Sequence, residues 1–278
     1  MPVRLIDRRA VKAEARDLIK TASVSPLKFT ALFLLIDLAL DEIAAAVGFL
    51  WLSDLNVSIG LSGFDLSLSF VAVLVSLLGT VLYAGYVNYC LRVQRGAVMP
   101  YESLFDAFSF AGKVILLTLA EGLLVGLVSM LFIMVGILFT ALFTALGLII
   151  FIALGAYVLL TYAFALFHLC EDPGASVLAA MRRSREEMRG YRMQLFLLLL
   201  SFFPLLLLEG LAVGLCETFL PVDTLSETLS GELLYTLVTG LASACVMLYL
   251  QPYLSLATAG FFRRATDAPE EPKEPWET

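Results

Sequence analysis

The stretch of sequence that decides the fold runs from Val114 to Phe167 and reads VILLTLAEGLLVGLVSMLFIMVGILFTALFTALGLIIFIALGAYVLLTYAFALF. It contains one acidic residue, Glu121, and no basic residue. A helix needs about 20 consecutive apolar residues to cross a bilayer. One continuous helix over this stretch would be about 80 Å long, whereas the hydrocarbon core is about 30 Å thick. The stretch therefore predicts a membrane protein whose chain crosses the bilayer more than once here.

The whole chain has the composition of an integral membrane protein. Of its 278 residues, 60% are hydrophobic and 15% are charged, whereas soluble domains carry about 25% charged residues. The net charge is −7, and nucleic-acid-binding proteins usually carry a basic patch and a high pI instead. We therefore expect a single all-α transmembrane domain over residues 1–262 that binds no nucleic acid.

Six apolar segments are long enough to cross the bilayer. They are residues 27–52, 66–91, 107–137, 142–169, 194–219 and 233–262. The third and fourth are fused, and we place the turn between them near Phe139–Thr144. The chain must cross an even number of times in this region, because basic residues precede and follow it and basic loops stay in the cytoplasm.

All 18 basic residues then fall on one side of the membrane. The predicted outer loops, about residues 53–65 and 220–232, carry acidic residues and no basic residue. The prediction is a multi-pass protein with six transmembrane helices and both termini in the cytoplasm. The acidic, proline-rich residues 263–278 are predicted to form a disordered tail.

Two of the predicted spans contain similar sequences. AEGLLVGLV at Ala120–Val128 and LEGLAVGLC at Leu208–Cys216 share six of nine residues and align Glu121 with Glu209. Both contain a GxxxG pair, a spacing that lets helices pack closely in membranes; the pairs are Gly122/Gly126 and Gly210/Gly214. The hypothesis is a fold of three hairpins, each beginning with a cytoplasmic amphipathic segment: residues 1–91, 92–169 and 170–262.

Acidic residues inside the predicted spans are the strongest functional signal. A carboxylate at the bilayer centre costs several kcal/mol unless it is paired or hydrated, and no lysine or arginine lies deep enough to pair with these. A polar cavity that binds cations or protons would use them, and Asp37 and Asp41 share one helical face. The alternative is that the acids nearer the outer surface anchor helix ends. The candidate intramembrane site consists of Asp37, Asp41, Glu121, Glu209 and Pro252.

Pro252 belongs to this candidate site because it interrupts the last span. A proline frees a backbone carbonyl that a neighbour or water must satisfy, and such breaks line binding sites in transporters. A simple kink is the alternative. We find no catalytic motif: the GLSG sequence at Gly60–Gly63 and the single histidine, His168, are separated by about 30 Å of bilayer, too far for a Ser–His pair. We expect no enzyme, no cofactor and no metal site.

Two cytoplasmic helices are predicted. Residues 7–20 have basic residues spaced by four, with Val11, Ala15 and Leu18 on another face. A second helix is predicted with Asp172 as its N-cap and Pro173 at its first position, and an apolar stripe follows. The stripe is Val177, Met181, Ser184, Met188 and Tyr191, and the basic residues beside it are Arg182, Arg183, Arg185, Arg189 and Arg192. These arginines could attract anionic lipid headgroups, dock a protein partner or simply anchor the topology.

The second half of the chain resembles the DUF975 family of bacterial integral membrane proteins. The residues that carry the resemblance are Asp172-Pro173, Ser184-Arg185, Met188 with Gly190, Phe196 through Ser201-Phe202, Pro252-Tyr253 and Phe261-Phe262. The family often has an Ile-Pro-Gly-Ile turn before the fourth span, where this chain reads LGLIIFIALGAY. The resemblance implies a helical fold in the bacterial cell membrane and no particular activity.

Two functions therefore stay open. The first is transport of a small ion or solute, or lipid handling, through a polar intramembrane site. The second is a membrane scaffold that binds an unknown protein partner through its arginine-rich helix. A cavity that reaches Asp37 or Glu121 would favour the first, and a solid bundle would favour the second.

Overall fold

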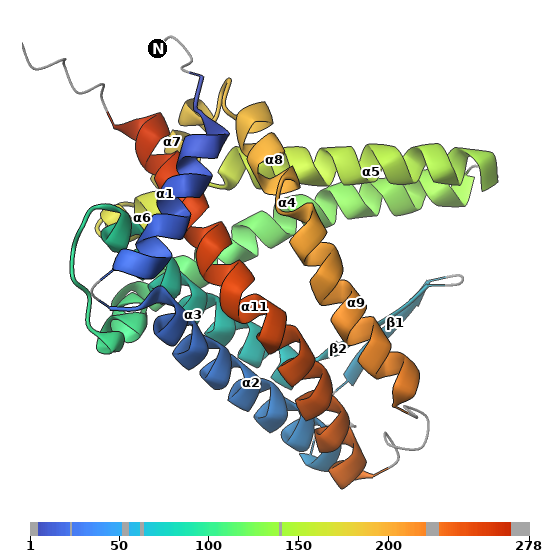
Figure 1. The fold of residues 1–278 in the computed structure, drawn as a ribbon. Coiled ribbons are helices and arrows are strands. Elements are labelled where there is room, and N and C mark those ends of the chain that lie inside the picture. The colour runs from blue at the N-terminus through green and yellow to red at the C-terminus, as the bar shows by residue number, and fades with distance from the viewer. Residues whose placement is uncertain are drawn as a thin grey trace, which may run out of the picture.

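A computed structural model describes residues 5–22, 24–51, 56–61, 64–138, 141–220 and 228–267. This part of the chain is helical except for one two-stranded hairpin (Figure 1). The elements in chain order are α1 (Arg8–Thr21), α2 (Pro26–Trp51), β1 (Asn56–Leu61), β2 (Phe64–Ser69), α3 (Phe70–Gln94), η2 (Tyr101–Phe110), α4 (Ala111–Leu138), α5 (Ala141–Tyr162), α6 (Ala165–Glu171), α7 (Val177–Glu187), α8 (Arg192–Leu200), α9 (Phe203–Phe219) and α11 (Leu229–Thr266).

Four described helical segments are long and apolar enough to cross a membrane. They are Val73–Gln94, Tyr101–Met130, Phe151–Glu171 and Leu229–Thr266. The pair α8 and α9, bent by 47°, makes a fifth if it counts as one span. α2 is not among them, because it contains three acidic residues, Asp37, Asp41 and Glu42, within two helical turns of one another. The helices fit a membrane protein, and the sixth span stays a prediction.

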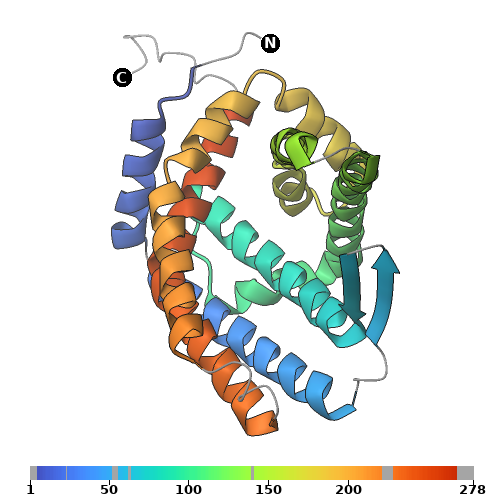
Figure 2. The same ribbon diagram turned by 90° about the vertical axis from the view of Figure 1, so that its right-hand side faces the viewer.

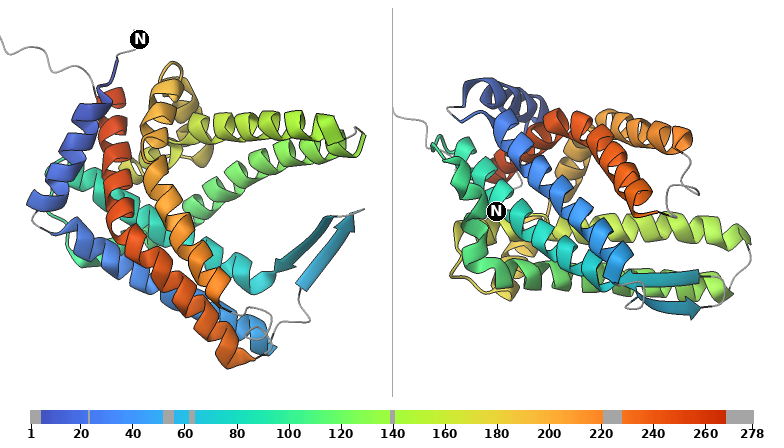
Figure 3. Two further views of the ribbon diagram at one scale, coloured as in Figure 1. Left: turned by 45° about the vertical axis from the view of Figure 1, so that its right-hand side comes forward. Right: turned by 90° about the horizontal axis from the view of Figure 1, so that it is seen from below.

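The long apolar stretch forms α4, α5 and the first residues of α6. α4 ends at Leu138 and α5 begins at Ala141, and the predicted turn between them lies partly outside the described residues. α5 ends at Tyr162 and α6 begins at Ala165, so the predicted fourth span, residues 142–169, is interrupted. α4 and α5 lie side by side and project away from the other helices (Figure 3). Many of their side chains are exposed and apolar, among them Leu123, Met130 and Leu159. This is the surface that a lipid environment would cover.

α11 is the central packing element of the bundle. It contacts α1, α2, α3 and α9, and its last turns lie beside α1 (Figures 1 and 2). There the Glu14 carboxylate accepts hydrogen bonds from Arg263 at 2.6 Å and from Arg264 at 2.8 Å. Arg263 also donates to the carbonyl oxygen of Gln94 at 2.6 Å. Segments from the start, middle and end of the described chain are therefore joined at one end of the molecule.

α2 and α3 are held together near that same end by aromatic residues. The rings of Phe29 and Tyr89 stack with their centroids 3.7 Å apart. The hydroxyl groups of Thr30 and Tyr86 lie 2.8 Å apart in a buried hydrogen bond. On the other side of α3, the Gly85 backbone lies directly against the backbone carbonyl of Leu104 in η2.

Several boundaries differ from the sequence predictions. The antiparallel hairpin of β1 and β2 occupies the predicted outer loop and the start of the predicted second span, so α3 begins at Phe70. The cap of α7 is Ser176, whose hydroxyl accepts from the Ala179 amide, while Asp172 caps the turn at Gly174. α11 continues to Thr266, past the predicted start of the tail at residue 263. Residues 268–278 lie outside the described part.

Within the described residues, the GxxxG glycines pack against no other helix. A Cβ atom built at any of the four would meet no described atom within 4 Å outside its own helix. Close helix packing through these pairs is therefore wrong for the described structure. The three-hairpin repeat stays a prediction, although the pairs α2–α3, α4–α5 and α9–α11 are each in contact.

Candidate intramembrane polar site

Asp37 and Asp41 line an open cleft between α2 and α3. The cleft has a volume of about 450 Å³, and its polar lining also includes Ser76, Thr80 and Tyr83. The two carboxylates are four residues apart on one helix face, where like charges repel each other. Gly79 adds no side chain opposite them: a Cβ built there would lie 3.7 Å from the Asp37 carboxylate. A bound proton or cation would relieve this repulsion.

Glu121 lines a second cavity, of about 270 Å³, that is walled mainly by aromatic and aliphatic residues. Its lining includes Tyr162 and Phe164 and one hydroxyl from α11, that of Thr258. Tyr83 lines both this cavity and the cleft at Asp37. The acidic residues that the sequence analysis placed in one site therefore line two cavities that share one tyrosine, and no described lysine or arginine is paired to Asp37, Asp41 or Glu121.

Glu209 and Pro252 line neither cavity. The Glu209 carboxylate accepts a hydrogen bond from the Ser243 hydroxyl at 2.8 Å and so joins α9 to α11. Pro252 is buried inside α11, which continues through it as a helix. Its neighbour Tyr253 packs edge-on against Phe202 at 4.8 Å between ring centroids. The structure thus separates these two residues from Asp37 and Glu121.

The arginines around α7 occupy two kinds of environment. Arg182, Arg185 and Arg189 are exposed. Arg183 is exposed too but donates to Glu187 at 2.9 Å, as the spacing of four residues suggests. Arg192 is turned toward α5, where it donates to the Tyr157 hydroxyl at 2.9 Å and lies 4.6 Å from the ring centroid. Of the five arginines predicted to contact lipid or a partner, four are exposed, and Arg192 is turned away toward α5.

The apolar stripe of α7 faces the bundle. Val177, Met181, Ser184 and Met188 are all buried. The Ser184 hydroxyl donates to the Thr161 carbonyl at 2.9 Å and accepts from the Phe164 amide at 3.2 Å. It therefore satisfies two backbone groups that the break between α5 and α6 leaves unpaired.

The buried His168 and the partly exposed Glu187 form a pair that no motif in the sequence predicts. The side chain of His168 is 3% exposed, and its Nε2 lies 2.7 Å from the Glu187 carboxylate. Its other nitrogen lies 4.0 Å from Glu171, which pairs with Arg95. Burial alone would raise the pKa of Glu187, but hydrogen bonds from His168 and Arg183 outweigh it, so the pKa lies below its usual value.

Glu187→Gln is expected to destabilise the protein in a pH-dependent way. A carboxyl group with a lowered folded pKa stabilises the fold above its unfolded pKa of about 4.3, and the contribution is lost as the pH falls through the folded value. At neutral pH we expect a loss of about 2 kcal/mol, typical of a hydrogen bond to a charged group. Apparent Tm in detergent should differ between the two proteins by a constant amount from pH 7 to about pH 5. It should converge only as the pH falls below about 4, through the lowered pKa of Glu187, so it is measured down to about pH 2.

The neighbouring Glu186 provides the control for this experiment, because it is exposed. Glu186→Gln should leave Tm unchanged throughout the same pH range. A Tm difference between Glu187→Gln and the unmodified protein that stays constant from pH 7 down to about pH 2 would show that the charge of Glu187 is unimportant.

Within the described ranges, no group of three or more His, Cys, Asp or Glu side chains could hold a metal ion. A profile described as "Protein of unknown function (DUF975)" matches residues 1–268. The chain belongs to the DUF975 family. The match covers the N-terminal half as well as the half that carries the motifs. No curated protein and no solved structure matches the chain. Membership in DUF975 therefore supplies no activity, and the function has to be argued from the cavities.

Proposed function

We propose that this DUF975 protein spans the bacterial cell membrane six times, with both termini in the cytoplasm, and transports a proton, a small cation or a small polar solute. The observation that carries the proposal is the open cleft in which Asp37 and Asp41 face Gly79 and Tyr83. Unpaired acidic residues in an apolar helical protein are functional candidates because their desolvation is costly. A bundle built only as a scaffold has no need of a cavity at these positions.

Contacts among the basic segments support the proposed topology. Arg95 pairs with Glu171, and the Lys113 ammonium donates to the backbone carbonyls of residues 173–175. Arg263 reaches both α1 and the end of α3. Segments that contact each other lie on the same side of a bilayer, and basic segments stay in the cytoplasm. The sixth crossing is assigned to α2, whose acids face the cleft.

The test is flux measured after reconstitution into liposomes. A pH-sensitive dye inside the vesicles reports proton flux, and a cation-sensitive dye reports cation flux. We expect Asp37→Asn to lower the flux at least tenfold, because the positioned charge is lost (about 1.4 kcal/mol per factor of ten). Glu121→Gln should also lower it, since Glu121 lines the cavity that shares Tyr83 with the cleft.

Glu209→Gln is the matched control. It removes an intramembrane carboxylate that is bonded to Ser243 outside both cavities, so it should leave flux unchanged. Proton and cation flux that is absent, or that persists in both Asp37→Asn and Glu121→Gln, would remove these two substrates from the proposal.

The second candidate function is a scaffold that binds a partner through α7. It is favoured by the exposure of Arg182, Arg185 and Arg189, none of which has an ion-pair partner within the described residues. Replacing these three with glutamine should abolish partner capture while leaving liposome flux intact. The two functions are thus separable by one set of variants.

A further inference from the structure

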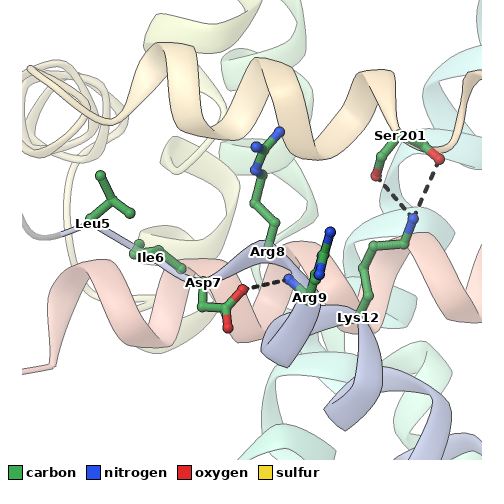
Figure 4. Close-up of a pocket in the computed structure, with 7 residues that line it drawn as sticks. All are labelled: Leu5, Ile6, Asp7, Arg8, Arg9, Lys12 and Ser201. Atoms are coloured by element: carbon green, nitrogen blue, oxygen red, sulfur yellow. Dashed lines mark hydrogen bonds between the residues drawn. The ribbon is translucent and has the colours of Figure 1, made fainter.

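A cavity lined by basic residues lies where the N-terminal segment crosses the α8–α9 junction. Its volume is about 350 Å³. Residues 5–9 and Lys12 form one side of it, and Ser201 forms the other (Figure 4). In Figure 4 the Arg8, Arg9 and Lys12 side chains extend toward the helix that carries Ser201. This cavity is separate from the cleft at Asp37 and shares no lining residue with it.

Two hydrogen-bonded contacts fix the shape of the cavity. The Ile6 amide donates to the Gln194 side chain at 2.9 Å. The Lys12 ammonium donates to the hydroxyl and the carbonyl oxygen of Ser201 at 3.0 and 3.3 Å. Lys12 also lies 4.6 Å from the ring centroid of Phe202. The walls are therefore held in place by α8 and by the bend that follows it.

The cavity carries unbalanced positive charge. The guanidinium groups of Arg8 and Arg9 have no hydrogen-bond or ion-pair partner within the described residues, and Lys12 meets only neutral oxygens and rings. The one carboxylate, that of Asp7, caps α1 by accepting from the Arg9 amide at 2.8 Å. Burial and the nearby Arg16 lower the pKa of Lys12, as expected for an ammonium without a counter-ion. The lining therefore suits an anion.

The surroundings favour an anion that is attached to a lipid. Leu5 lines the cavity and is 92% exposed, which is costly in water and favourable against an acyl chain. Ser201 lies about 14 Å along the helix from Arg192, within reach of the headgroup layer. Leu200 and Phe203, on either side of the bend, are about half exposed.

We infer that this cavity binds the phosphate of an anionic phospholipid headgroup through Arg8, Arg9 and Lys12. Guanidinium groups bind phosphate through two parallel hydrogen bonds, which gives both affinity and orientation. The site is distinct from the arginines of α7, whose exposed side chains line none of the described cavities.

The experiment uses the full chain, purified in a neutral detergent. Phosphatidylglycerol, phosphatidylcholine and inorganic phosphate are added separately at one ionic strength. Apparent Tm and native mass spectrometry report binding. We expect phosphatidylglycerol to raise Tm and to be retained as a single lipid, and we expect the other two to do neither. Arg8→Gln combined with Arg9→Gln should weaken this binding at least about tenfold.

Two further variants separate a binding site from general charge and from loss of structure. Asp7→Asn should bind the lipid more tightly, since asparagine still caps the helix but removes the negative charge. Lys20→Gln combined with Lys28→Gln removes the same charge from two exposed positions that line none of the described cavities, and should bind as the unmodified protein does. The inference fails if the arginine pair and the lysine pair weaken binding equally. It also fails if inorganic phosphate raises Tm as much as phosphatidylglycerol does, because the site would then bind a soluble ligand.

Discussion

Gly85→Ala is expected to leave little or no folded protein. The new Cβ atom would lie 1.9 Å from the Leu104 carbonyl oxygen and 2.8 Å from its carbon. Both atoms belong to the backbone of η2, so no side-chain rotation can relieve the clash. η2 is anchored by buried residues, including Leu104 and Ala107. Overpacking usually costs about 1–3 kcal/mol, and a clash between backbones should reach or exceed the upper value.

The measurement is the yield of monodisperse protein in detergent, together with its apparent Tm. Gly122→Ala in α4 is the matched control, because a Cβ there meets no described atom outside the helix. It should fold at least as well as the unmodified protein, since alanine favours helix by about 1 kcal/mol in water. Equal yields for the two variants would contradict the close approach of α3 and η2.

Phe262→Ala is expected to cost about 3–5 kcal/mol of folding free energy, the usual range for removing a buried phenylalanine. The ring is fully buried. It contacts Phe164 and Phe167 with centroid distances of 5.0 Å and His168 at 5.1 Å. The cavity left behind would lie between α6 and α11, beside the His168–Glu187 pair. Apparent Tm in detergent should fall by many degrees.

Phe203→Ala serves as the control, because that ring is 50% exposed on α9. Detergent or lipid would fill the vacated space, so a small change in Tm is expected. A loss of stability at Phe203 as large as that at Phe262 would show that the exposed face of α9 is covered by protein instead.

Features that depend on local pattern were predictable from the sequence. The spacing of basic and apolar residues predicts the helix at Arg8–Thr21, and Val11 and Ala15 are buried as that pattern requires. Hydrophobic length predicts that Val114–Phe167 is divided once; the structure has the separate helices α4 and α5 there, and a further break before α6 that length alone did not predict. The shared helix face of Asp37 and Asp41 follows from their spacing alone, and both line one cleft.

Features that depend on contacts between distant segments were not predictable. Glu209 and Glu121 have similar sequence surroundings, but Glu121 lines a cavity whereas Glu209 bonds to Ser243 of α11. The glycine pairs have the spacing of packing motifs and yet face open space, since the identity of the neighbouring helix is not a local property. Tyr83 carries no motif, and its place between two cavities emerges only from the packing of α3.

Described hydrogen bonds between different elements are concentrated at the basic end of the molecule. Those made by Lys113 and Arg263 are examples. Farther from the basic end, the described hydrogen bonds between elements join only α9 and α11. The hydrogen bond between Thr30 and Tyr86 joins α2 to α3. Asp37 lies about 10 Å farther along α2. This described hydrogen bond between α2 and α3 therefore lies near the basic end of the molecule. Widening or closing the cleft at Asp37 would break no described hydrogen bond between these two helices, but α11, which packs against Leu38 of α2 through Gly240, would have to move with α2.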